Sequence, residues 1–212
     1  SKWVFSPAPL QLQGLRAADV KLDVKIAELI TGSITAKNFE TKLDLANGLL
    51  LLSPIKTAML GTEAKAQLKL DASTSPAQFT LLAKATQFEV SQLVKFLDGK
   101  GDVEFSLASV GNSMRDFASN ANGWFNLTMA NGEVSSSGLG QVAGDVLNSF
   151  LPGAGGLTTP ALNCLAARFK IVNGIVQTNG VLADTSQGPM LASGAISLRD
   201  ELINLRLKHK SN

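Results

Sequence analysis

Most of this 212-residue chain alternates between apolar and polar residues, which is the two-residue period of a β-strand with one dry face. The clearest run spans residues 19–28, where charged residues of alternating sign separate the aliphatic ones. The aliphatic set is Val20, Leu22, Val24 and Ile26. Residues 162–207 repeat the pattern in several shorter runs. The sequence therefore predicts many amphipathic strands.

Asn-Gly dipeptides punctuate these runs. They begin at Asn47, Asn122, Asn131, Asn173 and Asn179. Asn-Gly is the strongest short-range signal for a tight hairpin, because both residues tolerate the positive φ angles of a primed turn. Strands joined by such turns predict a large antiparallel meander.

Three segments depart from the two-residue period. Residues 89–98, 113–120 and 138–151 have helical spacing, and Ser113 is a suitable N-cap for the second of them. The apolar phase also slips between Ala36 and Phe39, which predicts a one-residue bulge near Lys37-Asn38. The expected fold class is mainly β: a curled antiparallel sheet meander that forms an apolar groove, with two or three short helices.

We expect a single β-groove domain over residues 1–212. Residues 1–14 form an extended lead-in, residues 15–98 a first β portion with one short helix, and residues 99–212 a C-terminal portion. The chain begins at Ser1 without an initiator Met. This start suggests a fragment or a processed form of a longer protein.

The dry face needs a cover. About ten strands with ~4 inward apolar side chains each would expose on the order of 1,000–1,500 Å², equivalent to about 25–40 kcal/mol of lost burial. A second sheet, closure into a barrel, or an apolar ligand within a curled sheet would each solve this. The inward residues are mostly Ala, Val and Leu, and such smooth walls suit acyl chains.

Composition argues against most chemistry. The net charge is only +2, and no basic cluster is interleaved with aromatics, so nucleic acid is not an expected partner. One cysteine, Cys164, and one histidine, His209 near the end of the chain, serve metal binding poorly, and no carboxylate cluster has ligand spacing. The glycines of residues 138–144 are spaced wrongly for a dinucleotide loop. We predict no cofactor, no metal and no catalytic residue, hence not an enzyme.

The C-terminal half resembles the AsmA family of bacterial envelope proteins, which are relatives of TamB. The resemblance rests on GKGDVEFSLASVGNSMRDFASNANGWFNLTMANGEV at 99–134, LNCLAARFKIVNGIVQTNGVLADT at 162–185 and GAISLRDELINLRL at 194–207. It extends over roughly residues 15–207 and is strongest after Gly99.

This resemblance implies a β-groove (β-taco) protein of the periplasm, anchored in the inner membrane by an N-terminal helix absent from this sequence. It implies transfer of phospholipids between the inner and outer membranes, with acyl chains as the bound partner. An alternative is a structural or assembly module that supports outer-membrane protein biogenesis or envelope integrity by docking an outer-membrane or envelope protein through edge pairing, without carrying lipid.

The candidate groove-lining residues follow from the alternation, and each could equally belong to an ordinary core. They are Val20, Leu22, Val24, Ile26, Leu43, Leu45, Leu68, Leu70, Phe105, Leu107, Phe125, Leu127, Phe169, Ile171, Ile196 and Leu198.

Overall fold

A computed structural model describes residues 4–31, 34–59, 61–92, 97–134, 161–186 and 188–209. Nearly all of them lie in strands, as the alternation predicts. The elements in chain order are η1 (Gln13–Arg16), β1 (Val20–Thr31), β2 (Ile34–Ala46), β3 (Leu49–Met59), β4 (Thr62–Asp71), β5 (Ala77–Glu89), η2 (Val90–Gln92), β6 (Leu97–Asp98), β7 (Lys100–Gly111), α1 (Met114–Ser119), β8 (Asn122–Val134), β9 (Ala161–Val172), β10 (Ile175–Thr185), β11 (Gly188–Ser197) and β12 (Leu202–His209).

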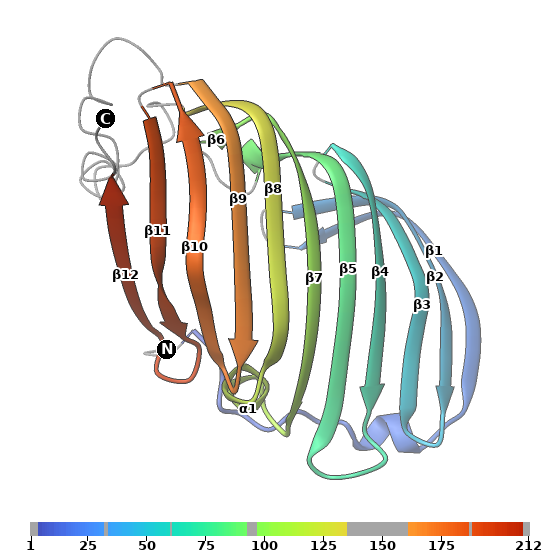
Figure 1. The fold of residues 1–212 in the computed structure, drawn as a ribbon. Helices are drawn as coiled ribbons and strands as arrows, with labels where there is room; N and C mark the ends of the chain where they lie inside the picture. Colours follow the sequence, from blue (N-terminus) through green and yellow to red (C-terminus); the bar gives the residue numbers. More distant parts are fainter. Residues whose placement is uncertain are drawn as a thin grey trace.

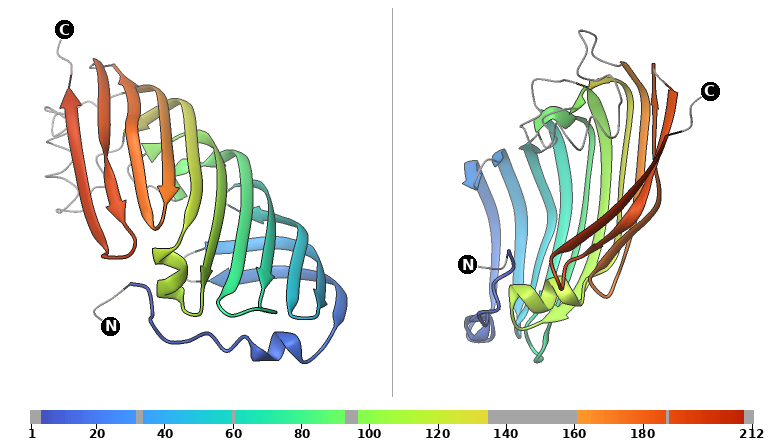
Figure 2. Two further views of the ribbon diagram at one scale, coloured as in Figure 1. Left: turned by 60° about the horizontal axis from the view of Figure 1, so that its bottom comes forward. Right: turned by 90° about the vertical axis from the view of Figure 1, so that its left-hand side faces the viewer.

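The strands form one antiparallel sheet in which sequence neighbours are also neighbours in space (Figure 1). Its order is β1-β2-β3-β4-β5-β7-β8-β9-β10-β11-β12, and the short β6 pairs with β8. The path is open, since β1 and β12 are its two ends. The sheet twists and curls, and β1 and β2 bend back behind the strands at its centre (Figures 1 and 2). The predicted curled meander is confirmed.

Two of the five Asn-Gly dipeptides make the predicted turns. Asn47-Gly48 and Asn173-Gly174 have positive φ at both residues and join β2 to β3 and β9 to β10. The dipeptides at Asn122, Asn131 and Asn179 lie inside β8 and β10 instead. For these three the prediction of a hairpin turn is wrong. Gly123 pairs with both β7 and β9, and Gly132 pairs with Leu162 of β9. Asn179-Gly180 lies at the register shift between Thr178 and Val181, so it makes a bulge within β10 and not a turn.

The predicted bulge in β2 is confirmed. The register between β2 and β3 shifts between Lys37 and Glu40, and Asn38 has a φ of 51°. The bulge changes the phase of β2, so that Phe39, Leu43 and Leu45 share one face with the aliphatic residues of β1. One extra residue thus keeps the dry face continuous.

Of the three predicted helices, one is confirmed and one is wrong where the structure describes it. α1 matches the prediction, and the Ser113 hydroxyl caps it by accepting a hydrogen bond from the Asp116 N–H at 3.1 Å. The helix expected over 89–98 is wrong where the structure describes it: Val90–Gln92 is a single 3₁₀ turn, and Leu97–Asp98 is a strand. A sheet edge near β8 competes successfully for those residues. The helix expected over 138–151 lies outside the described residues.

The N-terminal lead-in forms a strap, defined here as residues 4–19, that runs along one end of the strands (Figure 2). The N-terminal end of the strap meets the β11–β12 turn, where the N–H groups of Val4 and Phe5 donate to the Glu201 carboxylate at 2.9 and 3.0 Å. Its middle pairs with α1 and the loop before it, and its other side meets the β2–β3 and β4–β5 turns. The contacts there are Leu10 N–H to Asn112 O, Arg115 N–H to Ser6 O, the Arg16 guanidinium to Ala72 O and Thr74 O, and Asn47 N–H to the Asp19 carboxylate.

The attachment of the strap to the β11–β12 turn should depend on pH, because it is made through the Glu201 carboxylate. Hydrogen bonds from the Phe5 and Val4 N–H groups lower the pKa of the Glu201 carboxyl below its ordinary 4.5. The stability that the Glu201 carboxylate adds to the strap is therefore fully present above pH 4.5, and it is lost as the pH falls through the lowered pKa of the folded protein. We expect hydrogen exchange to show protected Val4 and Phe5 amides at neutral pH in the native protein but not in Glu201→Ala. Equal protection in both proteins would contradict this role.

Candidate functional site: the apolar face of the sheet

The cross-strand register places most of the apolar residues of the long strands on one side of the sheet, here called the apolar face. One row of directly paired residues crosses the whole sheet from β1 to β12. It consists of Leu22, Leu43, Leu52, Leu68, Leu81, Leu107, Gly123, Ile171, Val176, Ile196 and Ile203. Gly123 is its one position without a side chain, and every other residue of the row has a hydrocarbon side chain.

A second row lies beside the first and contains the aromatic part of the face. It runs through Val24, Thr41, Ile55, Ala66, Ala83, Phe105, Phe125 and Phe169. The rings of Phe125 and Phe169 lie 5.9 Å apart between centroids at 49°, a tilted pairing that aromatic quadrupoles favour. The buried hydroxyl of Thr41 donates to the Lys42 carbonyl at 3.3 Å and so presents no unpaired polar group.

The predicted lining residues share this face, with one exception. All of them except Leu198 are joined by the register described above or lie two residues away on the same strand. Leu198 was assigned wrongly to a strand, since β11 ends at Ser197 and Leu198 belongs to the following turn. Its N–H donates to the Gly174 carbonyl at 2.8 Å, which holds the turn against the neighbouring hairpin.

Short elements cover the two ends of the central strands on this side. At one end η2 and β6 fold over the face, and Phe88 and Val90 there are fully buried in a cluster with Met129 and Leu165. At the other end α1 packs on β5 and β7, with the Phe117 ring 5.8 Å from that of Phe79. The Ser109 hydroxyl donates to the Phe117 carbonyl at 2.7 Å and fixes the helix there. The two long rows lie between these covers.

The apolar face is most exposed at its two margins. Leu22 on β1 keeps 54% of its surface accessible, and Ile203 on β12 keeps 69%. Phe105, Phe125 and Phe169 in the middle are half-buried. The described strands include no second sheet facing this side, and β1 does not pair with β12. Neither a sandwich nor a barrel therefore covers the face in the described part of the chain.

Comparison with known proteins gives the family. The AsmA family model matches residues 1–181. The chain belongs to the AsmA family. The AsmA family protein YhjG of Escherichia coli strain K12 is 26% identical over 186 residues, which cover 84% of this chain and 27% of that relative. The chain thus spans about a quarter of the length of this AsmA relative. No solved structure matches the chain.

Several residues of the apolar face were missed by the sequence reading. Leu50, Leu52 and Ile55 of β3 lie in it, but Pro54 interrupts the alternation and suggests two separate runs. The register shift between Leu52 and Ile55 restores the same face beyond the proline, so β3 is one strand. The signal was available: an odd apolar run following an even one across a Ser-Pro step is what a bulge produces.

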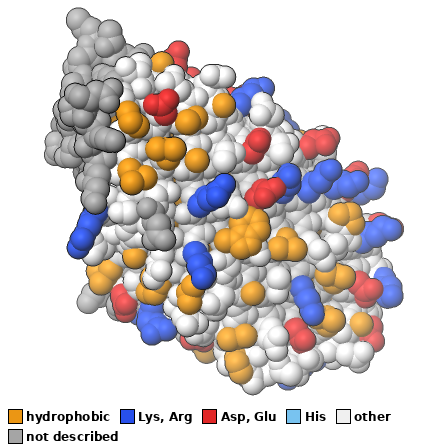
Figure 3. Space-filling model, viewed as in Figure 1, with side chains coloured by type: hydrophobic (Ala, Val, Ile, Leu, Met, Phe, Trp, Pro, Cys, Tyr) orange, Lys and Arg blue, Asp and Glu red, His pale blue; other side chains and the backbone are white. Residues whose placement is uncertain are grey.

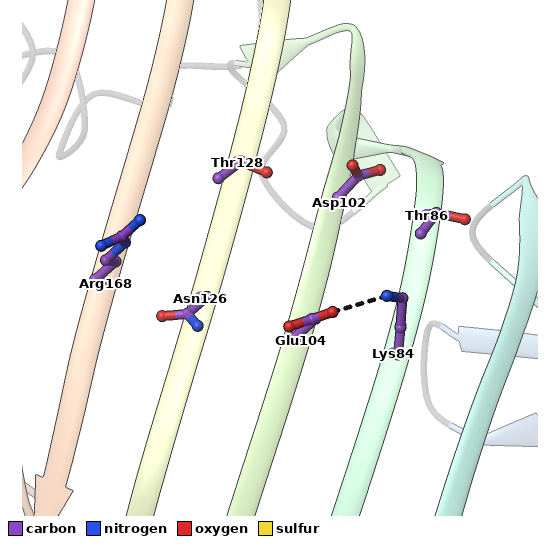
Figure 4. Close-up of a pocket in the computed structure, with 7 residues that line it drawn as sticks. All are labelled: Lys84, Thr86, Asp102, Glu104, Asn126, Thr128 and Arg168. Carbon is purple, nitrogen blue, oxygen red and sulfur yellow. Dashed lines mark hydrogen bonds and ion pairs between the residues drawn. The ribbon is translucent and has the colours of Figure 1, made fainter.

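The opposite side of the sheet, here called the polar face, is the outer side of the curl and carries charged side chains (Figure 3). Lys84 and Glu104 form an ion pair at 2.8 Å, and this hydrogen bond raises the pKa of Lys84. They line a shallow hollow of about 350 Å³ together with Thr86, Asp102, Asn126, Thr128 and Arg168 (Figure 4).

The described residues offer no candidate metal centre. No three acidic, histidine or cysteine side chains gather there closely enough to hold a metal ion. None of the helices in those ranges has the length and apolar character that a membrane crossing requires. The apolar face is therefore the feature from which a function can be argued.

Proposed function

We propose that this AsmA-family chain holds the acyl chains of phospholipids against its apolar face and serves as a module for phospholipid transfer between the inner and outer membranes. The observation that supports this proposal is the strip of paired hydrocarbon side chains that crosses the sheet from Leu22 to Ile203. The curl of the sheet toward this side would turn the strip into a groove. Burial of acyl chains would supply the cover that the described strands do not.

The mechanism is partition rather than chemistry. Each acyl CH₂ moved from water onto the face is worth ~0.8 kcal/mol, so a two-chain lipid gains many kcal/mol of gross burial. The headgroup would remain in water at a margin of the sheet, where Leu22 and Ile203 are exposed. Ala, Val and Leu walls offer no directional bonds, so a bound chain can slide. The proposal needs no catalytic residue and no cofactor.

The cellular location of the module is also part of the proposal, and membership of the AsmA family supports it. We place the module in the periplasm, held at the inner membrane by an N-terminal anchor elsewhere in the longer protein. Phospholipids of either membrane would then reach the face from their own leaflets. An envelope role of this kind is what the AsmA resemblance implies.

The test is a charge placed on the exposed margin of the strip. Leu22→Glu leaves the fold intact because the side chain is 54% accessible, but it puts a carboxylate where acyl chains would lie. We expect at least a tenfold loss of co-purified phospholipid, measured by native mass spectrometry and lipid extraction. Leu191→Glu is the matched control, since Leu191 is similarly accessible but lies on the polar face. Equal lipid content in both variants would refute the proposal.

A second candidate is an assembly module that pairs with another envelope protein. The observation that favours it is the open sheet, whose outer strands β1 and β12 each have one neighbour. Such an edge can accept a strand from a partner through backbone hydrogen bonds. This function would survive Leu22→Glu, because the substitution changes a side chain on the face and not the backbone of the edge. Retained assembly activity without lipid would favour this candidate.

A further inference from the structure

The polar face carries a basic stripe, defined here as the row of paired residues that crosses its middle. The row runs through Lys25, Glu40, Lys56, Lys65, Lys84, Glu104, Asn126 and Arg168. It holds five cations and two carboxylates, an excess of three positive charges on a chain whose net charge is +2. The stripe is visible as a band of blue and red across the outer surface (Figure 3).

The centre of the stripe places like charges side by side. Lys56 is paired directly with Lys65, and Lys65 with Lys84, on three adjacent strands. Glu104 neutralises Lys84 at one side and Glu40 bonds Lys25 at 3.2 Å at the other. Among the described residues Lys56 and Lys65 take part in no ion pair. Directly opposed like charges destabilise a sheet, so this arrangement costs the isolated protein stability.

Exposed apolar side chains lie next to the lysines. Trp124 and Leu82 keep 40% and 44% of their surfaces accessible on the same face. Together with Lys65, Lys84 and Glu104 they line one shallow hollow of about 340 Å³. Lysines beside an accessible tryptophan and leucine are the combination that binds an anionic bilayer surface: the cations meet phosphates while the indole enters the interface.

We propose that the polar face docks on an anionic membrane surface through the basic stripe, with Trp124 and Leu82 at the lipid interface. The positive stripe is complementary in charge to the phosphates, and their approach would relieve the Lys56–Lys65–Lys84 repulsion. This site is separate from the apolar face and does not depend on acyl chains being held there. A docked module would keep its apolar face turned away from the bilayer that the stripe contacts.

The experiment measures binding to vesicles of phosphatidylcholine with or without about one third phosphatidylglycerol. We expect binding only to the anionic vesicles, weakening as salt is raised. Near an anionic surface each lysine contributes about fivefold in affinity, so Lys65→Glu should weaken binding by about 25-fold. The control Lys100→Glu makes the same charge change outside the stripe and should weaken binding less than threefold.

Folding and docking can be separated in the same variant. Lys65→Glu places a carboxylate between Lys56 and Lys84, so its unfolding midpoint should be equal to or higher than that of the native chain. With Trp3→Phe, Trp124 is the sole tryptophan, and its emission should shift to shorter wavelength on anionic vesicles. Equal binding to neutral vesicles, equal effects of the two charge reversals, or an unchanged Trp124 emission would each overturn the proposal. Loss of lipid from the apolar face would leave these results unaffected.

Discussion

Replacement of Gly123 by alanine is expected to cost about 4 kcal/mol or more of unfolding free energy, the range that marks a severe backbone conflict. Gly123 lies at the centre of the apolar row, opposite Leu107 of β7 and Ile171 of β9. A Cβ atom there would stand 1.9 Å from the Ser106 carbonyl oxygen, and its φ of 153° also disfavours a side chain. The obstacle is backbone, so it cannot rotate away as a side chain could.

The measurement is urea unfolding of the native chain, Gly123→Ala and a matched control. Gly14→Ala serves as the control because a Cβ added there meets nothing within 4 Å. We expect a large drop in midpoint for Gly123→Ala and a change within about 0.5 kcal/mol for Gly14→Ala. A Gly123→Ala protein as stable as the control would show that β7 and β8 can separate without loss, contrary to the close approach in the structure.

The alternation of residues was sufficient to predict the two faces of the sheet. In β1 the charged positions Lys21 and Lys25 pair with Asp44 and Glu40 at 3.2 Å, while Leu22 pairs with Leu43 on the other side. A period of two needs no knowledge of which strand lies beside which, because both faces are defined within a single strand. That is why the alternation alone puts the predicted residues, apart from Leu198, on the apolar face.

Features that depend on pairing between strands could not be predicted in the same way. The Asn-Gly at Asn122 has the local chemistry of a turn, but pairing with both β7 and β9 keeps it in a strand. Likewise Lys56, Lys65 and Lys84 lie on three successive strands, and only the register reveals that they are directly paired. Local signals decide where strands form, whereas the basic stripe and the covers by α1 and η2 arise from tertiary pairing.

The central claim is that acyl chains lie on the apolar face of the sheet and not on the polar one. Phe105 and Ala108 belong to the same strand, β7, and are three residues apart. Because side chains alternate along a strand, Phe105, paired with Phe125, lies on the apolar face, and Ala108, paired with Asn122, lies on the polar face. A photo-crosslinking phenylalanine analogue can replace either residue. At Phe105 it preserves the shape of a half-buried ring, and at Ala108 it is accessible to solvent.

The most direct test is therefore to irradiate the two purified variants and count phospholipid adducts by mass spectrometry. Lipid held against the strip from Leu22 to Ile203 would react with the analogue at Phe105 at least ten times more than with that at Ala108. Equal labelling at both positions, or no lipid adduct at Phe105 in a folded protein that has been incubated with phospholipid, would contradict the account.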